Sequence, residues 1–257
     1  MIPKIIHYCW FGRNPKPELA EKCIESWHRI CPDYKIVEWN EETFDINSNM
    51  YVKQAYEAGK YAFVTDYVRL FAIYTVGGIY MDTDVMILKN LDQFLNHAAF
   101  SGFESKTKIP TGIIASEAGQ PLIGELLHYY NDARFAKEDG SYNMTTNVEI
   151  ITGLLTSRGF KPNGEFQVIS GVAFYPQNIF CPDHKKLNDK DYMRDTVTIH
   201  YFAGSWKSEA AKKREASLWW KMIAKPAMLV SKLFKALFGD KWVRMKDKLR
   251  DILFQSR

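Results

Sequence analysis

Two carboxylates that interrupt an apolar run are the residues of this sequence best suited to chemistry. Asp82 and Asp84 stand one residue apart within 79–88, where most other side chains are apolar. A buried carboxylate is costly unless a cation or dense hydrogen bonding compensates it. Alternate residues of a strand face the same side, so both carboxylates can face one site. Oxygen ligands of this kind suit Mg²⁺ or Mn²⁺, and the pair therefore predicts a metal-dependent diphosphate site. The alternative is a pair that caps a turn.

The elements around this run alternate between helix and strand. Residues 53–75 have an apolar face at helical spacing, broken at Gly59, and Gly77 and Gly78 end that helix. The pattern predicts strands at 4–10, 34–39, 79–81, 85–88, 98–103, 111–115, 168–175 and 196–201, and further helices at 18–29, 120–136 and 148–156. This alternation is typical of an α/β domain with a mostly parallel sheet.

Composition separates a mildly acidic body from a basic tail. The chain has 257 residues, 46% of them hydrophobic, which fits one main soluble domain. Residues 207–257 contain 14 Lys and Arg against 5 Asp and Glu, whereas 1–206 contain 20 against 25. The tail carries apolar residues and tryptophans at helical spacing between lysines, as in helices that lie in a membrane interface. We expect an anionic membrane surface as a partner through 216–257, and no nucleic acid. The alternative is a helical hairpin packed on the domain.

The sequence gives further indications of the compartment. The four cysteines form no CxxC pair and predict reduced, buried thiols: Cys9, Cys23, Cys31 and Cys181. The N-terminus lacks the apolar core of a signal peptide, and no stretch reaches the roughly 20 apolar residues of a membrane span. We therefore expect a cytoplasmic protein with peripheral contact to the inner face of the plasma membrane.

Three motifs together resemble glycosyltransferase family 32. They are the opening P-K-x-I-H-x-x-W within 2–12, D-x-x-R at 66–69, and G-G-x-Y-x-D-x-D at 77–84. That family includes bacterial capsule transferases, fungal Golgi mannosyltransferases and, more distantly, large glucosylating toxins. The resemblance implies an α/β, GT-A-like nucleotide-sugar-binding fold with a mostly parallel central sheet over 1–206, followed by the basic amphipathic helical tail, 207–257.

The resemblance also implies roles for individual residues in metal and donor binding. Asp84 would bind the metal directly, and Asp82 would contact the ribose or sugar and a metal-bound water. Asp66 and Arg69 would hold the donor sugar hydroxyls and a phosphate. Trp10 would stack on the base, at the carboxyl end of the first strand, where open α/β sheets usually bind ligands.

A late motif, H-Y-F-A-G-S-W at 200–206, is similar to one in related retaining transferases. It implies that His200 completes the metal ligands and that the residues after it approach the diphosphate: Gly204, Ser205, Trp206 and Lys207. The family positions also bring Asn147 and Glu149 near the donor sugar. The catalytic residues implied are Asp82, Asp84, Arg69 and Asn147. Without the resemblance, His200, Trp10 and Trp206 would be core residues, and Asp66 and Arg69 a plain helical pair.

The function implied is transfer of a hexose from a nucleotide-diphosphate sugar, a UDP-sugar by analogy, with retention of anomeric configuration. The acceptor would be a saccharide or lipid-linked saccharide in bacterial surface polysaccharide synthesis, and the metal Mn²⁺ or Mg²⁺. One alternative is a haloacid dehalogenase-type phosphatase with Asp82 as nucleophile. That class usually has Thr or Val two residues after the second aspartate, where this sequence has Met86. A third reading is a non-enzymatic protein that binds membrane surfaces through its tail.

Overall fold

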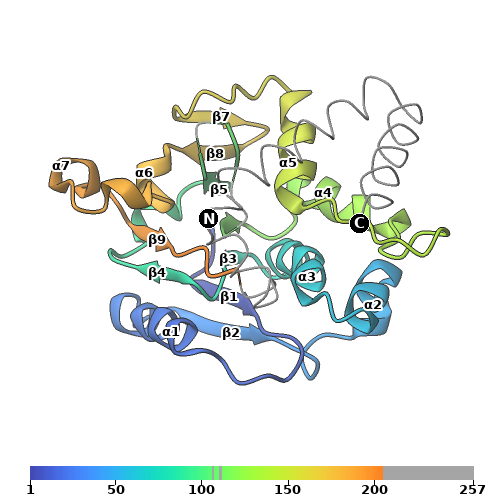
Figure 1. Ribbon diagram of the computed structural model, residues 1–257. Helices are drawn as coiled ribbons and strands as arrows, with labels where there is room; N and C mark the ends of the chain where they lie inside the picture. Colours follow the sequence, from blue (N-terminus) through green and yellow to red (C-terminus); the bar gives the residue numbers. More distant parts are fainter. Residues whose placement is uncertain (106, 110–111, 205–257) are drawn as a thin grey trace, which may run out of the picture. The chain divides into compact units, whose positions relative to one another are not determined.

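A seven-stranded sheet forms the centre of the computed structural model, which describes residues 1–105, 107–109 and 112–204 (Figure 1). Its strands lie in the order β2-β1-β3-β6-β5-β8-β7. Their bounds are β1 Ile5–Cys9, β2 Lys35–Trp39, β3 Gly78–Met81, β5 Ala99–Gly102, β6 Ile113–Ser116, β7 Gln167–Ile169 and β8 Val172–Tyr175. β1, β2 and β3 are parallel neighbours, as are β5 and β8, whereas β6 and β7 run the other way. The prediction of an α/β domain with a mostly parallel sheet is therefore confirmed.

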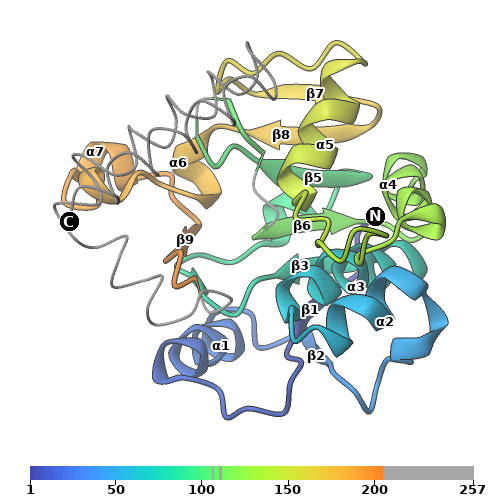
Figure 2. The same cartoon turned by 45° about the vertical axis from the view of Figure 1, so that its right-hand side comes forward.

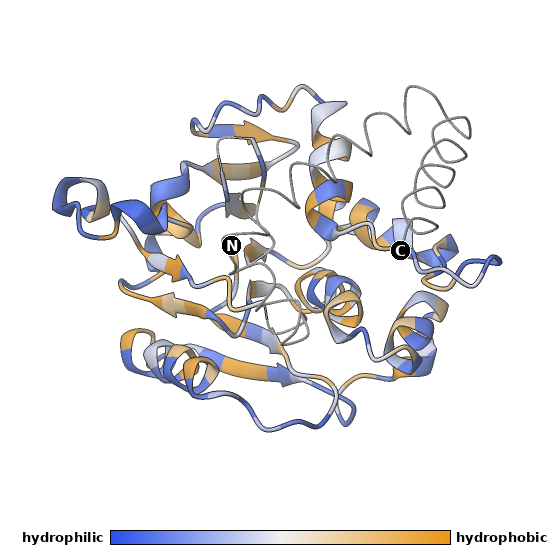
Figure 3. Cartoon of the chain, in the orientation of Figure 1, coloured by the Kyte–Doolittle hydropathy of each residue, from blue (hydrophilic) through white to orange (hydrophobic). Residues whose placement is uncertain are grey.

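Helices cover both faces of this sheet (Figure 2). Each face has its own apolar core. One face packs against four helices: α2 Met50–Glu57, α3 Tyr61–Thr75, α4 Pro121–Asp132 and α5 Asn147–Thr156. The other face packs against α1 Glu18–Ile30 and the short α6 Gln177–Phe180; a further short helix is α7 Lys190–Met193. Figure 3 shows the contrast between the apolar α3, which is mostly buried, and the hydrophilic α7.

A second, two-stranded sheet lies beside the end of β3 and consists of β4 Val85–Ile87 and β9 Thr198–His200. The prediction that Asp82 and Asp84 share one strand is wrong. β3 ends at Met81, and the amide of Val85 donates to the carbonyl of Asp82 (3.0 Å), so the aspartates lie in the turn where the chain passes from one sheet to the other.

The predicted helices and strands are found within a few residues of the expected bounds, with one further correction. The single strand predicted at 168–175 is a hairpin of β7 and β8, because Ser170 and Gly171 adopt positive φ angles of 50° and 77° and reverse the chain. The helical region before the aspartates is two helices that meet around Gly59, which has a φ of 65°.

The cysteines, the absence of a membrane span and the basic tail were also predicted from the sequence. The four cysteines are free and buried. Among the described residues, no helix is both long and apolar enough to cross a membrane. Met1–Ala203 form one compact unit. The amphipathic tail, 207–257, and the site predictions Ser205, Trp206 and Lys207 lie outside the described residues, so the tail's predicted role stays a prediction.

Candidate active site

The aspartate turn lies at the carboxyl end of β3, beside the end of β1. Asp82 still pairs with the neighbouring strand region, because its amide donates to the carbonyl of Gly112 (2.9 Å). The chain then turns into β4, which pairs antiparallel with β9 so that Val85 lies opposite His200. This pairing brings a histidine more than a hundred residues later in the sequence against the two aspartates.

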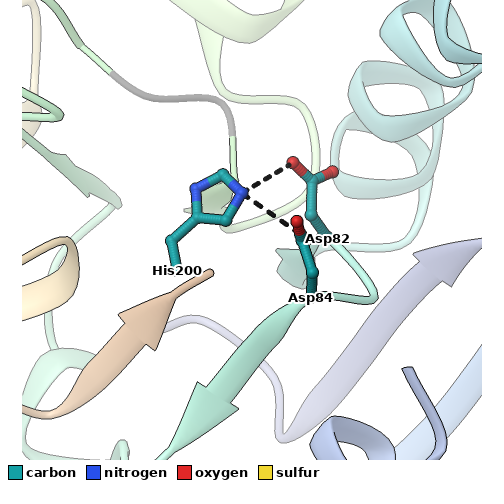
Figure 4. Close-up of side chains that lie close together, drawn as sticks. All are labelled: Asp82, Asp84 and His200. Atoms are coloured by element: carbon teal, nitrogen blue, oxygen red, sulfur yellow. Dashed lines mark ion pairs between the residues drawn. The ribbon is translucent and has the colours of Figure 1, made fainter. Parts of the chain in front are cut away.

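Asp82, Asp84 and His200 each present one ligand atom, and these atoms lie within 4.8 Å of one another (Figure 4). His200 Nε2 is 3.1 Å from Asp84 Oδ1 and 3.9 Å from Asp82 Oδ2. Two carboxylate oxygens and one imidazole nitrogen are a suitable donor set for Mn²⁺, which accepts both kinds of ligand. The residues therefore fit the divalent cation that the sequence predicts.

Each carboxylate of this group is anchored through its other oxygen. The Tyr80 hydroxyl donates to Asp82 Oδ1 (2.8 Å), and Arg69 Nη1 lies 3.4 Å from the same atom. The amide of Ala203 donates to Asp84 Oδ2 (2.8 Å). Asp82 Oδ2 and Asp84 Oδ1 are thus the oxygens left to face His200. This division pre-organises the group, because neither carboxylate can rotate without losing a hydrogen bond.

Arg69 links this group to a third aspartate. Its Nη2 lies 3.2 Å from Asp66 Oδ1, and its guanidinium lies 4.7 Å from the centre of the Tyr80 ring. Burial opposes the charged form of Arg69, yet Tyr80, Asp82 and Asp66 raise its pKa, so it stays a cation. Burial raises the pKa of Asp66 to about 6, although Arg69 lowers it. The D-x-x-R pair is therefore a buried ion pair that touches the metal-site carboxylate.

Asn147 lies behind Asp66 at the start of α5. Its Nδ2 donates to the carbonyl of Asp66 (2.8 Å), its backbone amide donates to Asp66 Oδ2 (3.3 Å), and its Oδ1 accepts from the Tyr130 hydroxyl (2.6 Å). Only 1% of Asn147 is exposed. These bonds hold the peptide and carboxylate of Asp66 in position. Glu149 is used locally, in a capping box with Thr146.

His200 and Asp84 form an ion pair. Burial lowers the pKa of His200, but Asp84, Cys181 and Asp82 together raise it to about 10. The pKa of Asp84 is lowered from its usual value, because His200 and the Ala203 amide outweigh the effect of burial. Phe202 stacks on the imidazole with ring centres 4.1 Å apart, and its φ of 52° is unusual for a residue other than glycine.

Trp10 lies just after β1, partly buried, and its Nε1 donates to the carbonyl of Asn14 (2.6 Å). Lys16 Nζ lies 6.0 Å from its ring centre. No contact in the described chain joins Trp10 to the aspartates, so base stacking stays a prediction. Gly204 is described, with a φ of 58°. The fold thus brings six predicted residues together: Asp66, Arg69, Asp82, Asp84, Asn147 and His200.

Three residues near the site were not predicted as site residues. Tyr80 binds Asp82 and underlies Arg69, and its place within the G-G-x-Y-x-D-x-D motif was the available signal. Gly112 lies so close to His200 that a Cβ there would be 2.7 Å from imidazole Nδ1. Glu104 follows β5 at the same edge of the sheet. A polar residue directly after a strand was its only sequence signal.

Comparisons with known proteins indicate the family that this chain resembles. Residues 17–101 match the family model described as a glycosyltransferase sugar-binding region containing a DXD motif. Inositol phosphoceramide mannosyltransferase 3 of Schizosaccharomyces pombe is 32% identical over 139 residues, which are 52% of this chain and 38% of that protein. An uncharacterized glycosyltransferase of Acanthamoeba polyphaga mimivirus is 26% identical over 199 residues, 71% of this chain and 78% of that one.

Among solved structures, a galactosyltransferase, LgtC, in complex with donor and acceptor sugar analogs aligns with a TM-score of 0.41 and 15% identity. The alignment covers 80% of this chain and 91% of that chain. The family match includes Asp66, Arg69, Asp82 and Asp84, whereas His200 lies beyond it. The match confirms the resemblance drawn from the motifs and, with the observed sheet, the GT-A-like fold class.

Proposed function

We propose, from the match of residues 17–101 to the glycosyltransferase sugar-binding region containing a DXD motif, that this chain transfers a hexose from a nucleotide-diphosphate sugar to a saccharide acceptor. The observation that supports the proposal most directly is that a possible metal site and a buried ion pair lie next to each other at the end of β3. The ligand atoms of Asp82, Asp84 and His200 lie together, and Arg69 joins Asp82 to the buried Asp66.

The aspartates and His200 would hold Mn²⁺ or Mg²⁺. A divalent cation bound there supplies Lewis-acid stabilisation of the negative charge that develops on the diphosphate as it leaves. Asp66 and Arg69 would bind hydroxyl groups of the donor sugar, because a carboxylate accepts and a guanidinium donates hydrogen bonds to hydroxyls. Tyr80 and Asn147 would act through these residues, by fixing Asp82 and Asp66.

We propose transfer with retention of anomeric configuration. The bond from the anomeric carbon to the phosphate oxygen breaks, and its electron pair leaves on the nucleoside diphosphate. The acceptor oxygen bonds to the anomeric carbon on the face that the diphosphate leaves, and the acceptor proton goes to the departing phosphate oxygen. This course requires no carboxylate nucleophile, and Asp82 and Asp84 are each already held by a hydrogen bond.

The substrates follow from resemblance. We propose a UDP-sugar as donor and a saccharide or lipid-linked saccharide as acceptor, in bacterial surface polysaccharide synthesis. One relative is named as a mannosyltransferase of inositol phosphoceramide, so mannose and a lipid-linked acceptor belong in any first screen. This chain spans 38% of that relative's length. The phosphatase and the non-enzymatic alternatives are less favoured, because the family match covers both aspartates.

We also propose, from the sequence alone, that the protein is cytoplasmic and touches an anionic membrane surface through 216–257. The basis is the alternation of lysines with apolar residues and tryptophans in that segment. Deletion of 216–257 should abolish flotation with vesicles that contain phosphatidylglycerol and leave donor hydrolysis intact. Flotation that is unchanged by the deletion would contradict this proposal.

The decisive experiment compares Asp84→Asn with Asp195→Asn, a change at an exposed aspartate. Each protein is incubated with Mn²⁺ and a panel of UDP- and GDP-sugars, and release of the nucleoside diphosphate is measured. Asp84→Asn should reduce release by about 100-fold or more, the effect of removing a strong electrostatic contribution to the transition state. Asp195→Asn and the wild type should be equal. Hydrolysis of p-nitrophenyl phosphate without release from any sugar nucleotide would favour the phosphatase instead.

A further inference from the structure

The sheet register brings one more carboxylate to the catalytic edge. β6 lies between β3 and β5, and Met81 pairs with Ile113, so that Asp82 follows opposite Gly112. β5 and β6 pair with Ala99 opposite Ser116 and Phe100 opposite Ala115. The same register, extended beyond both strands, would bring Phe103 opposite Gly112. Neighbouring strands lie about 4.8 Å apart, so Asp82 and Phe103 are separated by roughly 10 Å across β6. The next residue is Glu104.

The backbone of Glu104 is fixed on both sides. Its amide donates to the carbonyl of Lys108 (2.8 Å), which closes a short turn after β5. Its carbonyl accepts from Gln177 Nε2 (2.7 Å), at the start of α6. Two separate elements thus hold this peptide at the end of β5, as is usual for a residue that a site needs in one position.

The carboxyl group of Glu104, by contrast, has no hydrogen-bond or ion-pair partner in the described part of the chain. The residue is half-buried, and burial raises its pKa although His200 and Lys108 lower it. It therefore lies within the electrostatic reach of His200 and Asp82, yet it is not part of the group whose ligand atoms meet within 4.8 Å. A partly buried carboxylate without a donor is costly, so a donor from a ligand would stabilise it.

We propose that Glu104 binds a hydroxyl group of the saccharide acceptor. A carboxylate accepts hydrogen bonds and repels phosphate, so a neutral hydroxyl is the complementary group. The donor sugar already has the Asp66–Arg69 pair, which comes from α3 on the opposite face of the sheet from β9 and α6. The backbone of Glu104 is anchored by α6, and its carboxylate lies within the electrostatic influence of His200, so we assign it to the second substrate.

This inference rests on the proposed function, and the experiment distinguishes a failure of the inference from a failure of the proposed function. Wild type, Glu104→Gln and the exposed-site control Glu138→Gln are incubated with Mn²⁺ and the sugar nucleotide that the wild type hydrolyses best. Hydrolysis is measured alone, and transfer is measured to methyl glycosides of mannose, glucose and galactose and to octyl mannoside. Circular dichroism melts check that all three proteins are folded.

Glu104→Gln should lower transfer by about 10- to 100-fold, through a raised KM for the glycoside, because a hydrogen bond to a charged group is lost. Hydrolysis of the donor and Mn²⁺ affinity should match the wild type, and Glu138→Gln should transfer normally. Equal loss of hydrolysis and transfer would assign Glu104 to the donor or metal and overturn the proposal, as would unchanged transfer. Absence of both hydrolysis and transfer in the wild type would refute the proposed function itself.

Discussion

Replacement of Gly112 by alanine tests whether the metal group depends on close approach of a strand backbone to His200. Gly112 stands just before β6, and its carbonyl holds the Asp82 amide. Its φ lies outside the left-handed region, since it is absent from the glycines with positive φ. Alanine can therefore adopt this backbone, and any effect must come from the added methyl group.

The size of the disturbance follows from the contacts that this methyl group would make. A Cβ at position 112 would lie 2.7 Å from both Nδ1 and Cε1 of His200, and ordinary contact begins at 3.4 Å. The imidazole would have to retreat by about 0.7 Å, more than the ~0.5 Å tolerance of a functional site. The retreat would also disturb the stacking on Phe202. We expect Mn²⁺ affinity to fall by about 10- to 100-fold, the usual effect of disturbing the support of a metal ligand.

Isothermal titration with Mn²⁺ measures this effect, with Gly153→Ala as the matched control. Gly153 lies within α5 with no described atom within 4 Å of its would-be Cβ. Alanine there should leave Mn²⁺ binding unchanged and stabilise the protein by about 0.5–1 kcal/mol, from helix propensity. Gly112→Ala should instead destabilise it by about 1–3 kcal/mol, the usual cost of overpacking. Wild-type Mn²⁺ affinity in a folded Gly112→Ala protein would refute the argument from close approach.

Two more predictions concern the same group. Tyr80→Phe removes the hydroxyl that holds Asp82, and should weaken Mn²⁺ binding about tenfold, as for other groups that orient metal ligands. Tyr34→Phe, which removes an equally short bond (2.8 Å) to Asp92 away from the site, should leave binding unchanged; equal weakening by both would point to a general loss of stability. Mn²⁺ affinity should also rise with pH between about 6 and 9, with release of protons, because the metal needs neutral His200. Titrations in buffers of different ionisation enthalpy measure that release.

Much of the fold could be predicted from the sequence because the signals are local. Helical periodicity within 61–75 and the short apolar run after Gly78 depend on neighbouring residues, and both elements form where expected. The prediction of one strand for Asp82 and Asp84 was wrong because the chain stops pairing with β6 after β3 and pairs with β9 in β4. That change depends on a strand far away in the sequence. A buried turn and a buried strand end can have the same kinds of neighbouring residues, so the local sequence does not distinguish them.

The residues of the site also differ in how far the local sequence predicts their contacts. Asp66 and Arg69 are three residues apart on one helix, so their pairing was predictable from spacing alone. His200 required the family resemblance, because its contact with Asp84 spans more than a hundred residues and depends on the register of β4 and β9. The positions of Gly112 and Glu104 near the site depend on the order of the strands in the central sheet, which no local sequence pattern predicts.

The charges of the group explain why a divalent cation is a suitable ligand. Asp66, Asp82 and Asp84 bring three negative charges, and Arg69 with a protonated His200 brings two positive ones. A divalent cation that displaces the His200 proton makes these five residues and the ion neutral, whereas a monovalent one gains nothing by the exchange. Without metal, the raised pKa of His200 stabilises the fold fully below its ordinary value of 6.5, and this contribution is lost as the pH rises toward about 10. Metal should therefore raise the melting temperature most at alkaline pH. A shift that is the same at pH 6 and pH 9 would show that His200 is not a ligand.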